Sequence, residues 1–471
     1  MRNVGWRIFM GTAAVLVLLA HTGRGNNLTI TNVTLTNVGV GEADIQFDVS
    51  WDHSWRTSWN DNGGAVTVTN WDAVWVFAKF RQSGQLWHHV MLTATGHTAT
   101  GGTTLTVADD GGGKRLGAFV CRTADGSGSM TCNTMRLHWN YAASGLATTN
   151  ELDLAVFGVE MVFIPQGAFS LGSGGSEPYH FYRYPEVTTP YVVTSEDAIA
   201  VGAVTGNLCY AGGLDVGSIP ATYPKGYRAF YCMKYEITEG QYVDFLNLLD
   251  PGIASTYKPG QITTANGIYI SVAPTRACAY LNGDQILTYM DWCGLRPMTD
   301  LEFEKVCRGV RTPWINEYVW GNTTAIQQTG YDGTDGSGTE TATPTNANVN
   351  CGIGSAGRVG IFARTNSSRQ DSGAGYYGNM DLGGNLLEMV VYPGFDVGRA
   401  FQDVYGDGNE YTSWSAFWPT RGTVAYGRRG GYHSSSSLDE IRISDRRYCD
   451  GSLPYSGGSP ANGARGVRTP P

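Results

Sequence analysis

The stretch that decides the fold of this 471-residue chain reads Gly294-Leu-Arg-Pro-Met-Thr-Asp-Leu-Glu-Phe-Glu-Lys-Val-Cys-Arg-Gly309. Thr299 is a typical N-cap residue, and we expect a helix to follow it as far as Cys307. Upstream, Thr238-Glu-Gly-Gln241 has a capping-type start and predicts a second helix that runs through Tyr242, Phe245 and Leu246. A third helix is expected over roughly 274–292. Short strands and long Gly-rich loops fill the rest of residues 159–471, which indicates a loop-rich α+β domain.

Further motifs flank this stretch in a fixed order. They are Met161-Val-Phe-Ile-Pro-Gln-Gly-Ala-Phe-Ser-Leu-Gly-Ser173, Phe230-Tyr-Cys-Met-Lys-Tyr-Glu-Ile-Thr-Glu-Gly-Gln-Tyr-Val-Asp-Phe245, Asp381-Leu-Gly-Gly-Asn-Leu-Leu-Glu-Met389, Arg429-Gly-Gly-Tyr432, the arginines from Arg442 to Arg446, and Gly466-Val-Arg468. Together with the central stretch, they resemble the formylglycine-generating-enzyme (sulfatase-modifying factor) superfamily. The ordered set is far more specific than any single motif. The resemblance implies, for residues 159–471, a loop-rich α+β fold related to C-type lectins.

The chemistry of the active family members is missing from this sequence. In those enzymes two cysteines lie a few residues beyond the Gly-Gly pair, where they bind copper and activate oxygen. The corresponding stretch here reads Gly430-Gly-Tyr-His-Ser-Ser-Ser-Ser-Leu-Asp-Glu440 and contains no cysteine. A serine hydroxyl is a hard ligand that stays protonated near neutral pH, so it cannot replace a thiolate on Cu(I). We therefore expect no copper and no catalysis, and we keep residual oxidase activity only as the last alternative.

The resemblance also implies a calcium turn in the Gly-Asn-x-x-Glu segment. Asn385 and Glu388 occupy its positions, and their oxygens are hard ligands of the kind that Ca²⁺ prefers. The alternative is that both residues only cap and hydrogen-bond a buried turn. A second acidic loop holds Asp403, Asp407, Asn409 and Glu410, but its spacing does not fit an EF-hand, so we predict a solvated loop there.

Residues 432–462 correspond to the ligand-facing region of the family. The segment is rich in Ser, Tyr, Asp and Arg, which make adaptable polar contacts. The candidate ligand-facing residues are Tyr432, His433, Arg442 and Arg446. Arginines at the edge of a core also pair with internal carboxylates, and this second interpretation of Arg442 and Arg446 stays open.

Residues 26–158 have a different pattern, with short runs that alternate apolar and polar residues. Alternation is clear over 27–36, 44–51 and 135–141, whereas 73–80 is apolar on both faces, as in a central buried strand. Such strands between Gly, Asn and Asp turns predict an all-β antiparallel sandwich ahead of the α+β domain. Six tryptophans between Trp51 and Trp87 either fill its core or form an aromatic platform for sugars or a partner domain.

The first 25 residues have the pattern of a secretory signal peptide. Arg2 and Arg7 precede an apolar run over 8–20, which is shorter than the roughly 20 residues that a membrane span needs. Cleavage is expected after Ala20 or Gly25. We therefore predict a secreted protein with no membrane span after signal removal.

Nine cysteines in an exported chain predict disulfides, and the odd number leaves at least one cysteine unpaired or bonded to another molecule. Cys121 and Cys132 flank a turn-forming cluster at 124–129, so a hairpin would place them opposite each other. Cys293 and Cys307 are a second candidate pair. Four Asn-x-Ser/Thr sequons are candidate glycosylation sites or chance occurrences in a Thr-rich chain: Asn27, Asn32, Asn322 and Asn366.

Charge and composition narrow the class of function. Charged residues make up 15% of the chain and the net charge is −9 without a basic block, which argues against nucleic-acid binding. We predict a secreted, non-catalytic structural or assembly protein of a cell surface or an extracellular filament. Self-association would use an exposed sandwich edge or the strand-like 27–37 tail. The alternative is a lectin-like protein that binds a glycan or protein ligand through the 432–462 face.

Overall fold

The computed structural model describes most of the chain. The described residues are 27–110, 112–210, 212, 215–409, 418–419, 424–449 and 458–471, together with the backbone of the short strands β1 (Ile8–Phe9) and β2 (His21–Gly23). The predicted signal peptide, with Arg2, Arg7 and the cleavage positions Ala20 and Gly25, otherwise lies outside the described residues. Within the described ranges no helix has the length and apolar character needed to cross a membrane.

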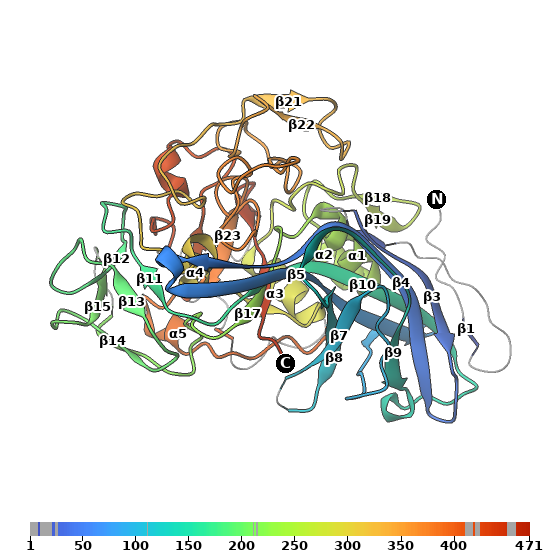
Figure 1. Cartoon of the computed structure of the whole chain (residues 1–471). Helices are drawn as coiled ribbons and strands as arrows, with labels where there is room; N and C mark the ends of the chain where they lie inside the picture. Colours follow the sequence, from blue (N-terminus) through green and yellow to red (C-terminus); the bar gives the residue numbers. More distant parts are fainter. Residues whose placement is uncertain are drawn as a thin grey trace.

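Strands account for 37% of the chain and helices for 12%, so the predicted β-rich class with some α+β character is confirmed at this level. One 13-stranded sheet dominates the structure (Figure 1). Beyond β1 and β2, its members are β3 (Leu28–Thr36), β4 (Glu42–Asp61), β5 (Val66–Gln82), β6 (His88–His89), β7 (Thr103–Asp109), β8 (Arg115–Arg122), β9 (Gly126–Asn140), β10 (Glu151–Ile164), β17 (Phe230–Met233), β20 (Arg296–Pro297) and β26 (Gly466–Arg468).

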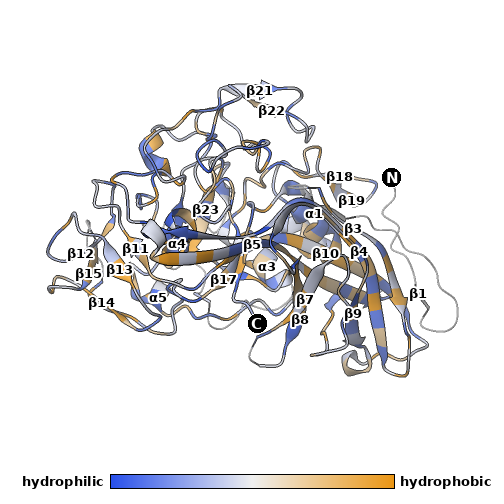
Figure 2. Ribbon diagram, in the orientation of Figure 1, coloured by the Kyte–Doolittle hydropathy of each residue, from blue (hydrophilic) through white to orange (hydrophobic). Residues whose placement is uncertain are grey.

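The N-terminal strands form two packed layers around one apolar core. β4 pairs with β3 and β9 in one layer, while β5 pairs with β8 and β10 in the other. Alternate side chains of both layers, such as Phe47, Leu137, Val76 and Leu154, are buried together between them. Figure 2 shows the alternation of apolar and polar residues along β4 and β9. The predicted strand over 73–80 lies within β5 and is buried on both faces, as expected.

The β5–β10 layer also forms the floor of a second core. Its opposite face presents Trp75, Phe77 and Phe157, which pack against Trp292 and other residues of the C-terminal part. Because both faces of this layer are covered, β5 and β10 read as nearly continuous apolar runs. The predicted domain boundary at 158/159 falls inside β10, and β10 continues by pairing with β17 through Met161–Ile164.

Helix capping follows the sequence at two of the three predicted helices. α1 (Glu239–Leu248) begins at a capping box between Thr238 and Gln241, and α4 (Asp300–Arg308) begins at Thr299. The third prediction is wrong in its first half, because α3 covers only Gly283–Trp292 and starts after the N-cap Asn282. Neither α2 (Pro251–Tyr257) nor the single turn α5 (Asp396–Arg399) was predicted.

Small sheets and single turns complete the C-terminal part. They are β11 (Phe169–Leu171) with β13 (Tyr191–Val193); β12 (Phe181–Arg183), β15 (Leu208–Tyr210), β14 (Ile199–Val201) and β16 (Gly217–Ile219); β18 (Thr263–Ala265) with β19 (Ile268–Ile270); β21 (Gly330–Asp332) with β22 (Thr341–Thr343); and β24 (Tyr426–Arg429), β23 (Leu387–Val391) and β25 (Asn462–Gly463). The 3₁₀ turns are η1 (Asn62–Gly64), η2 (Ala142–Ser144) and η3 (Leu438–Ile441).

The β4–β5 hairpin extends from the sandwich across the C-terminal part. At its tip Asp61 accepts hydrogen bonds from Arg311 Nε at 2.9 Å and from the Tyr376 hydroxyl at 2.5 Å. The tryptophans follow this arrangement. Trp51 alone of the six lies in the sandwich core, whereas the other five pack against the second core, so the partner-domain alternative describes them better.

Candidate functional site

The separate motifs of residues 159–471 meet in a buried network of ion pairs around α4. This helix buries five charged side chains, Asp300, Glu302, Glu304, Lys305 and Arg308, each almost fully excluded from solvent. Charges in such an environment must be paired and hydrogen-bonded, because an isolated buried ion costs several kcal/mol. Their partners therefore determine which residues remain available for chemistry.

Arginines from the C-terminal motifs supply most of these partners. Arg446 donates from Nε to Asp300 at 2.9 Å and from Nη2 to Glu304 at 2.5 Å, and Arg429 pairs with Asp300. Arg308 contacts Glu304 at 2.8 Å. Burial raises the pKa of the Glu304 carboxyl, but Arg446 and Arg308 outweigh it and hold the pKa well below its usual range. Arg446 is thus an internal ion-pair residue, and its assignment to the ligand-facing surface is corrected.

Asn385 lies on a buried turn and Glu388 lies in the strand β23 that follows it, but the side-chain oxygens of both residues already have hydrogen-bond partners. The Asn385 Oδ1 accepts from the Gly357 N–H at 2.7 Å and from Asn350 Nδ2 at 3.0 Å. Arg465 donates two hydrogen bonds to the Glu388 carboxylate, from Nε at 2.7 Å and from Nη2 at 2.5 Å. The Arg465 guanidinium therefore occupies both carboxylate oxygens that Glu388 would offer to a metal ion, and this donor set does not fit calcium. The observed arrangement is the buried turn that was the alternative interpretation.

Two further carboxyls crowd this turn. Asn385 Nδ2 and the Leu386 N–H both donate to Glu236, and the Gly360 N–H donates to Asp381 at 2.6 Å. Burial raises the pKa of Glu236, Asp381 and Glu388, and in Asp381 it brings the pKa to about 6. Arg465 lowers each of these pKa values but does not cancel the effect of burial. Three acidic groups thus lie near the fully buried Arg465, and Glu388 is the one that forms an ion pair with it.

The raised pKa of Asp381 predicts a pH-dependent stability. Between the ordinary pKa of 3.8 and the folded-state pKa of about 6, the native state keeps a proton that the unfolded chain has released. This contribution to stability is complete below pH 3.8 and is lost as the pH rises through about 6. Asp381→Asn stays neutral, so we expect it to be about 1–3 kcal/mol more stable than the wild type at pH 7.5 but not at pH 4.

Urea unfolding at the two pH values measures this difference. The control is Asp335→Asn, because the Asp335 side chain is 39% exposed in its pair with Arg276 and should show no such pH-dependent gain. A constant difference between Asp381→Asn and the wild type across the pH range would contradict the assignment.

The remaining candidate ligand-facing residues are partly enclosed. His433 is buried, with Nδ1 at 2.8 Å from Ser434 Oγ and Nε2 at 3.0 Å from the Pro460 carbonyl. Arg442 is half-buried and pairs with Asp439 at 2.6 Å, while Tyr432 is half-exposed. Residues 450–457 of the predicted 432–462 face lie outside the described residues.

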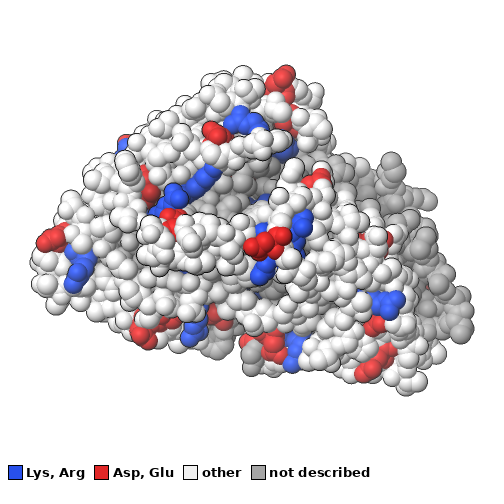
Figure 3. Space-filling view, in the orientation of Figure 1, with Lys and Arg blue, Asp and Glu red and all other residues white. Residues whose placement is uncertain are grey.

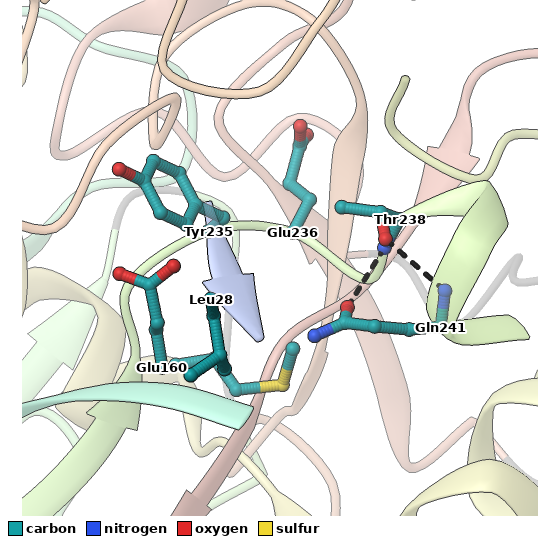
Figure 4. A pocket seen from close by; sticks show the side chains of 7 residues that line it. Leu28, Glu160, Tyr235, Glu236, Thr238 and Gln241 are labelled. Atoms are coloured by element: carbon teal, nitrogen blue, oxygen red, sulfur yellow. Dashed lines mark hydrogen bonds between the residues drawn. The ribbon is translucent and has the colours of Figure 1, made fainter. Parts of the chain in front are cut away.

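A small cavity borders the acidic turn. It has a volume of about 10 Å³, enough for roughly one water molecule. Figure 4 shows Glu160 and Tyr235 on one side and the capping box of Thr238 and Gln241 on the other, with Leu28 nearby. Such a space can hydrate the carboxyl groups but cannot hold a substrate, whose pocket typically exceeds about 300 Å³.

The second acidic loop is partly solvated, as predicted, but it also bonds to the rest of the protein. Asp403 accepts from Arg296 Nε at 2.6 Å, and the Asp407 N–H donates to Asp291 of α3 at 2.8 Å. Asn409 follows in the same described segment, whereas Glu410 lies outside the described residues. The Asp403 side chain is 30% exposed but pairs with the buried Arg296, and the Asp407 side chain is 40% exposed, so the solvated-loop interpretation is correct only in part.

The predicted Cys121–Cys132 disulfide is not formed. All nine cysteines are free thiols, including Cys293 and Cys307. β8 and β9 do not make the expected hairpin, because β8 pairs with β5 and β7 whereas β9 pairs with β4. As a result Cys121 points into the second core and Cys132 points into the sandwich core.

Two of the four sequon asparagines belong to a regular ladder on the outer face of the sandwich. Asn27, Asn32 and Asn37 all have positive φ, and their Nδ2 atoms donate to Asp52, Asp48 and Asp44 at 2.7, 2.6 and 2.6 Å. The five-residue spacing of these asparagines in the sequence is the pattern from which the ladder could have been predicted. Of the other sequons, Asn366 is exposed, and Asn322 is half-buried and donates to Gln370 at 2.8 Å.

Removing one step of the ladder is expected to have a moderate cost. Asn32→Ala loses the hydrogen bond to Asp48. It also places alanine at φ 54°, a left-handed conformation that asparagine adopts more readily than alanine, so we expect the free energy of unfolding to fall by about 1–2 kcal/mol. Asn32→Gly keeps the backbone conformation and should cost less. Chemical denaturation of both variants tests this ordering, and an equal effect of Ala and Gly would contradict the backbone argument.

Comparisons with known proteins do not place this chain in a family. No family model matches it, and no curated protein matches it either.

Proposed function

We propose that this chain is a secreted, non-catalytic structural or assembly protein of a cell surface or an extracellular filament. The observation that carries the proposal is that the charged residues of the candidate site are used to hold the structure together. Glu388 is paired with Arg465, and Asp300 and Glu304 are paired with Arg446, all without solvent contact. A catalytic or ligand-binding site needs some of these groups accessible to a reactant.

We also propose that residues 159–471 have the loop-rich fold of the formylglycine-generating-enzyme superfamily, related to C-type lectins. Support comes from the convergence of motifs that are distant in sequence. Residues 300 and 446 pair directly, as do 388 and 465, so motifs that are distant in sequence meet in buried ion pairs. The cysteine-free stretch from Gly430 to Glu440 supports a scaffold that has kept this network without the copper chemistry.

Surface character is compatible with an assembly role. Charged side chains are sparse, and Figure 3 shows basic and acidic residues interspersed over the face in view. A surface with few charges and many Ser, Thr, Asn and Gly residues has little electrostatic repulsion between identical copies.

Size-exclusion chromatography and negative-stain microscopy of the mature protein test this function. We expect defined oligomers or fibres whose amount rises with protein concentration. A discrete monomer that captures a glycan or a protein ligand would favour the lectin-like alternative. Stoichiometric copper binding with thiol-dependent oxygen consumption would overturn the non-catalytic assignment.

A further inference from the structure

Strand β7 (Thr103–Asp109) presents a seven-residue open edge. In the described part of the chain β7 pairs with β8 and with no other strand. The outward N–H and C=O groups of an edge strand form a template on which another strand can pair. Figure 1 places β7 and β8 at the lower margin of the molecule, away from the C-terminal loops around β21 and β22.

Other edges of the same sheet carry protection that β7 lacks. β20 contains Pro297, and the open side of β9 is bridged by Leu92 and Thr98. β3 is covered on its far side by β2 over residues 28–30, and its register against β4 is irregular between Thr31 and Thr34. By contrast, residues 103–108 of β7 contain no proline and no charged residue, and the one charge of the strand, Asp109, pairs with Arg115 at 2.6 Å. The register of β7 against β8 is irregular only between Ala108 and Asp109, at the end of the strand. Residues 103–108 therefore lack the Lys, Pro or bulge with which soluble proteins normally block such an edge.

The side chains of β7 also leave the rim of the sandwich core incompletely covered. Leu105 and Val107 pack against that core but are only partly buried, because the layer ends at β7. Thr104 and Thr106 project from the opposite face and are exposed. A strand added beside β7 would extend the layer and cover Leu105 and Val107 at the same time.

We propose that β7 pairs antiparallel with β7 of a second copy, forming a two-fold dimer that is the building unit of the assembly. The strand suits its own copy. With Leu105 opposite Leu105 at the two-fold axis, Thr104 faces Thr106 and Thr103 faces Val107. The two β-branched side chains of each of these pairs suit cross-strand packing, and no charged residues oppose each other between 103 and 107. This inference rests on the proposed function and names the surface and the partner for it.

Cysteine cross-linking tests the register directly. The background is Cys209→Ser, because Cys209 is the one cysteine of nine that is not buried. In that background Leu105→Cys should give a disulfide-linked dimer under mild oxidation. The matched control is Thr57→Cys, at an exposed position on β4 that is already paired with Asn70 of β5, and it should remain uncross-linked.

A charge substitution gives the complementary measurement. Leu105→Lys places two like charges opposite each other at the axis, so we expect self-association to weaken at least tenfold, and circular dichroism checks that the variant is folded. Thr57→Lys adds the same charge away from the edge and should associate like the wild type. Sedimentation velocity measures the association of both variants.

The outcomes separate this inference from the proposed function. A wild-type protein that assembles while Leu105→Cys stays uncross-linked and Leu105→Lys associates normally overturns the β7 interface and leaves the assembly role standing. Cross-linking only between Leu105→Cys and Thr34→Cys copies overturns self-pairing in favour of a β7–β3 contact. A wild-type chain that stays monomeric at all accessible concentrations overturns both.

Discussion

Arg465→Ala is expected to destabilise the protein by about 3–5 kcal/mol, because it removes the cation from a fully buried pair. Arg465 binds Glu388 through two nitrogens and also donates to the backbone carbonyls of Met233, Lys234 and Met380. Its removal leaves Glu388 beside the buried carboxyls of Glu236 and Asp381 and exposes none of them to water. Urea unfolding at pH 7.5 measures the loss, and fluorescence should report partial unfolding if the native state is marginal.

A double variant separates charge from packing. Glu388→Gln with Arg465→Met removes both charges and keeps similar volumes, so part of the lost stability should return relative to Arg465→Ala. The matched surface control is Arg276→Ala, whose partner Asp335 is 39% exposed and whose loss should cost no more than about 1 kcal/mol. Equal losses for Arg276→Ala and Arg465→Ala would contradict the role given to the buried pair.

Trp292→Ala is expected to cost about 3–5 kcal/mol and to lower one common unfolding transition of the whole chain. The Trp292 ring is 2% exposed and lies 5.2 Å from Phe77, 5.1 Å from Phe157 and 5.4 Å from Phe245, measured between ring centroids. It therefore joins the floor formed by β5 and β10 to helices α1 and α3. Differential scanning calorimetry and circular dichroism should show the two halves unfolding together.

An exposed tryptophan provides the control for this variant. Trp314 is 64% exposed, so Trp314→Ala should change stability by no more than about 0.5 kcal/mol. Two resolved transitions, with only the later one shifted by Trp292→Ala, would show that the sandwich and the C-terminal part unfold independently.

Local patterns in the sequence were sufficient for much of the secondary structure. The capping residues Thr238 and Thr299 act within three residues of themselves, so the starts of α1 and α4 could be predicted without any tertiary information. Alternation located β3, β4 and β9, and the apolar run in β5 identified a strand buried on both faces. The helix over 274–292 was overextended because an apolar run does not show where an N-cap such as Asn282 interrupts it.

The partners of the buried charged residues are distant in sequence, so local sequence patterns could not predict them. The sequence around a carboxylate such as Glu388 does not show whether that group binds a metal ion, faces solvent or pairs with an arginine 77 residues away. Cys121 and Cys132 likewise lie in different cores, because β8 pairs with β5 whereas β9 pairs with β4. The sequence by itself determined the local elements and the order of the motifs, since these depend on interactions within a few residues. Only the tertiary structure decided which charged side chains form buried ion pairs, because burial and a distant partner set the free energy of each ionised group.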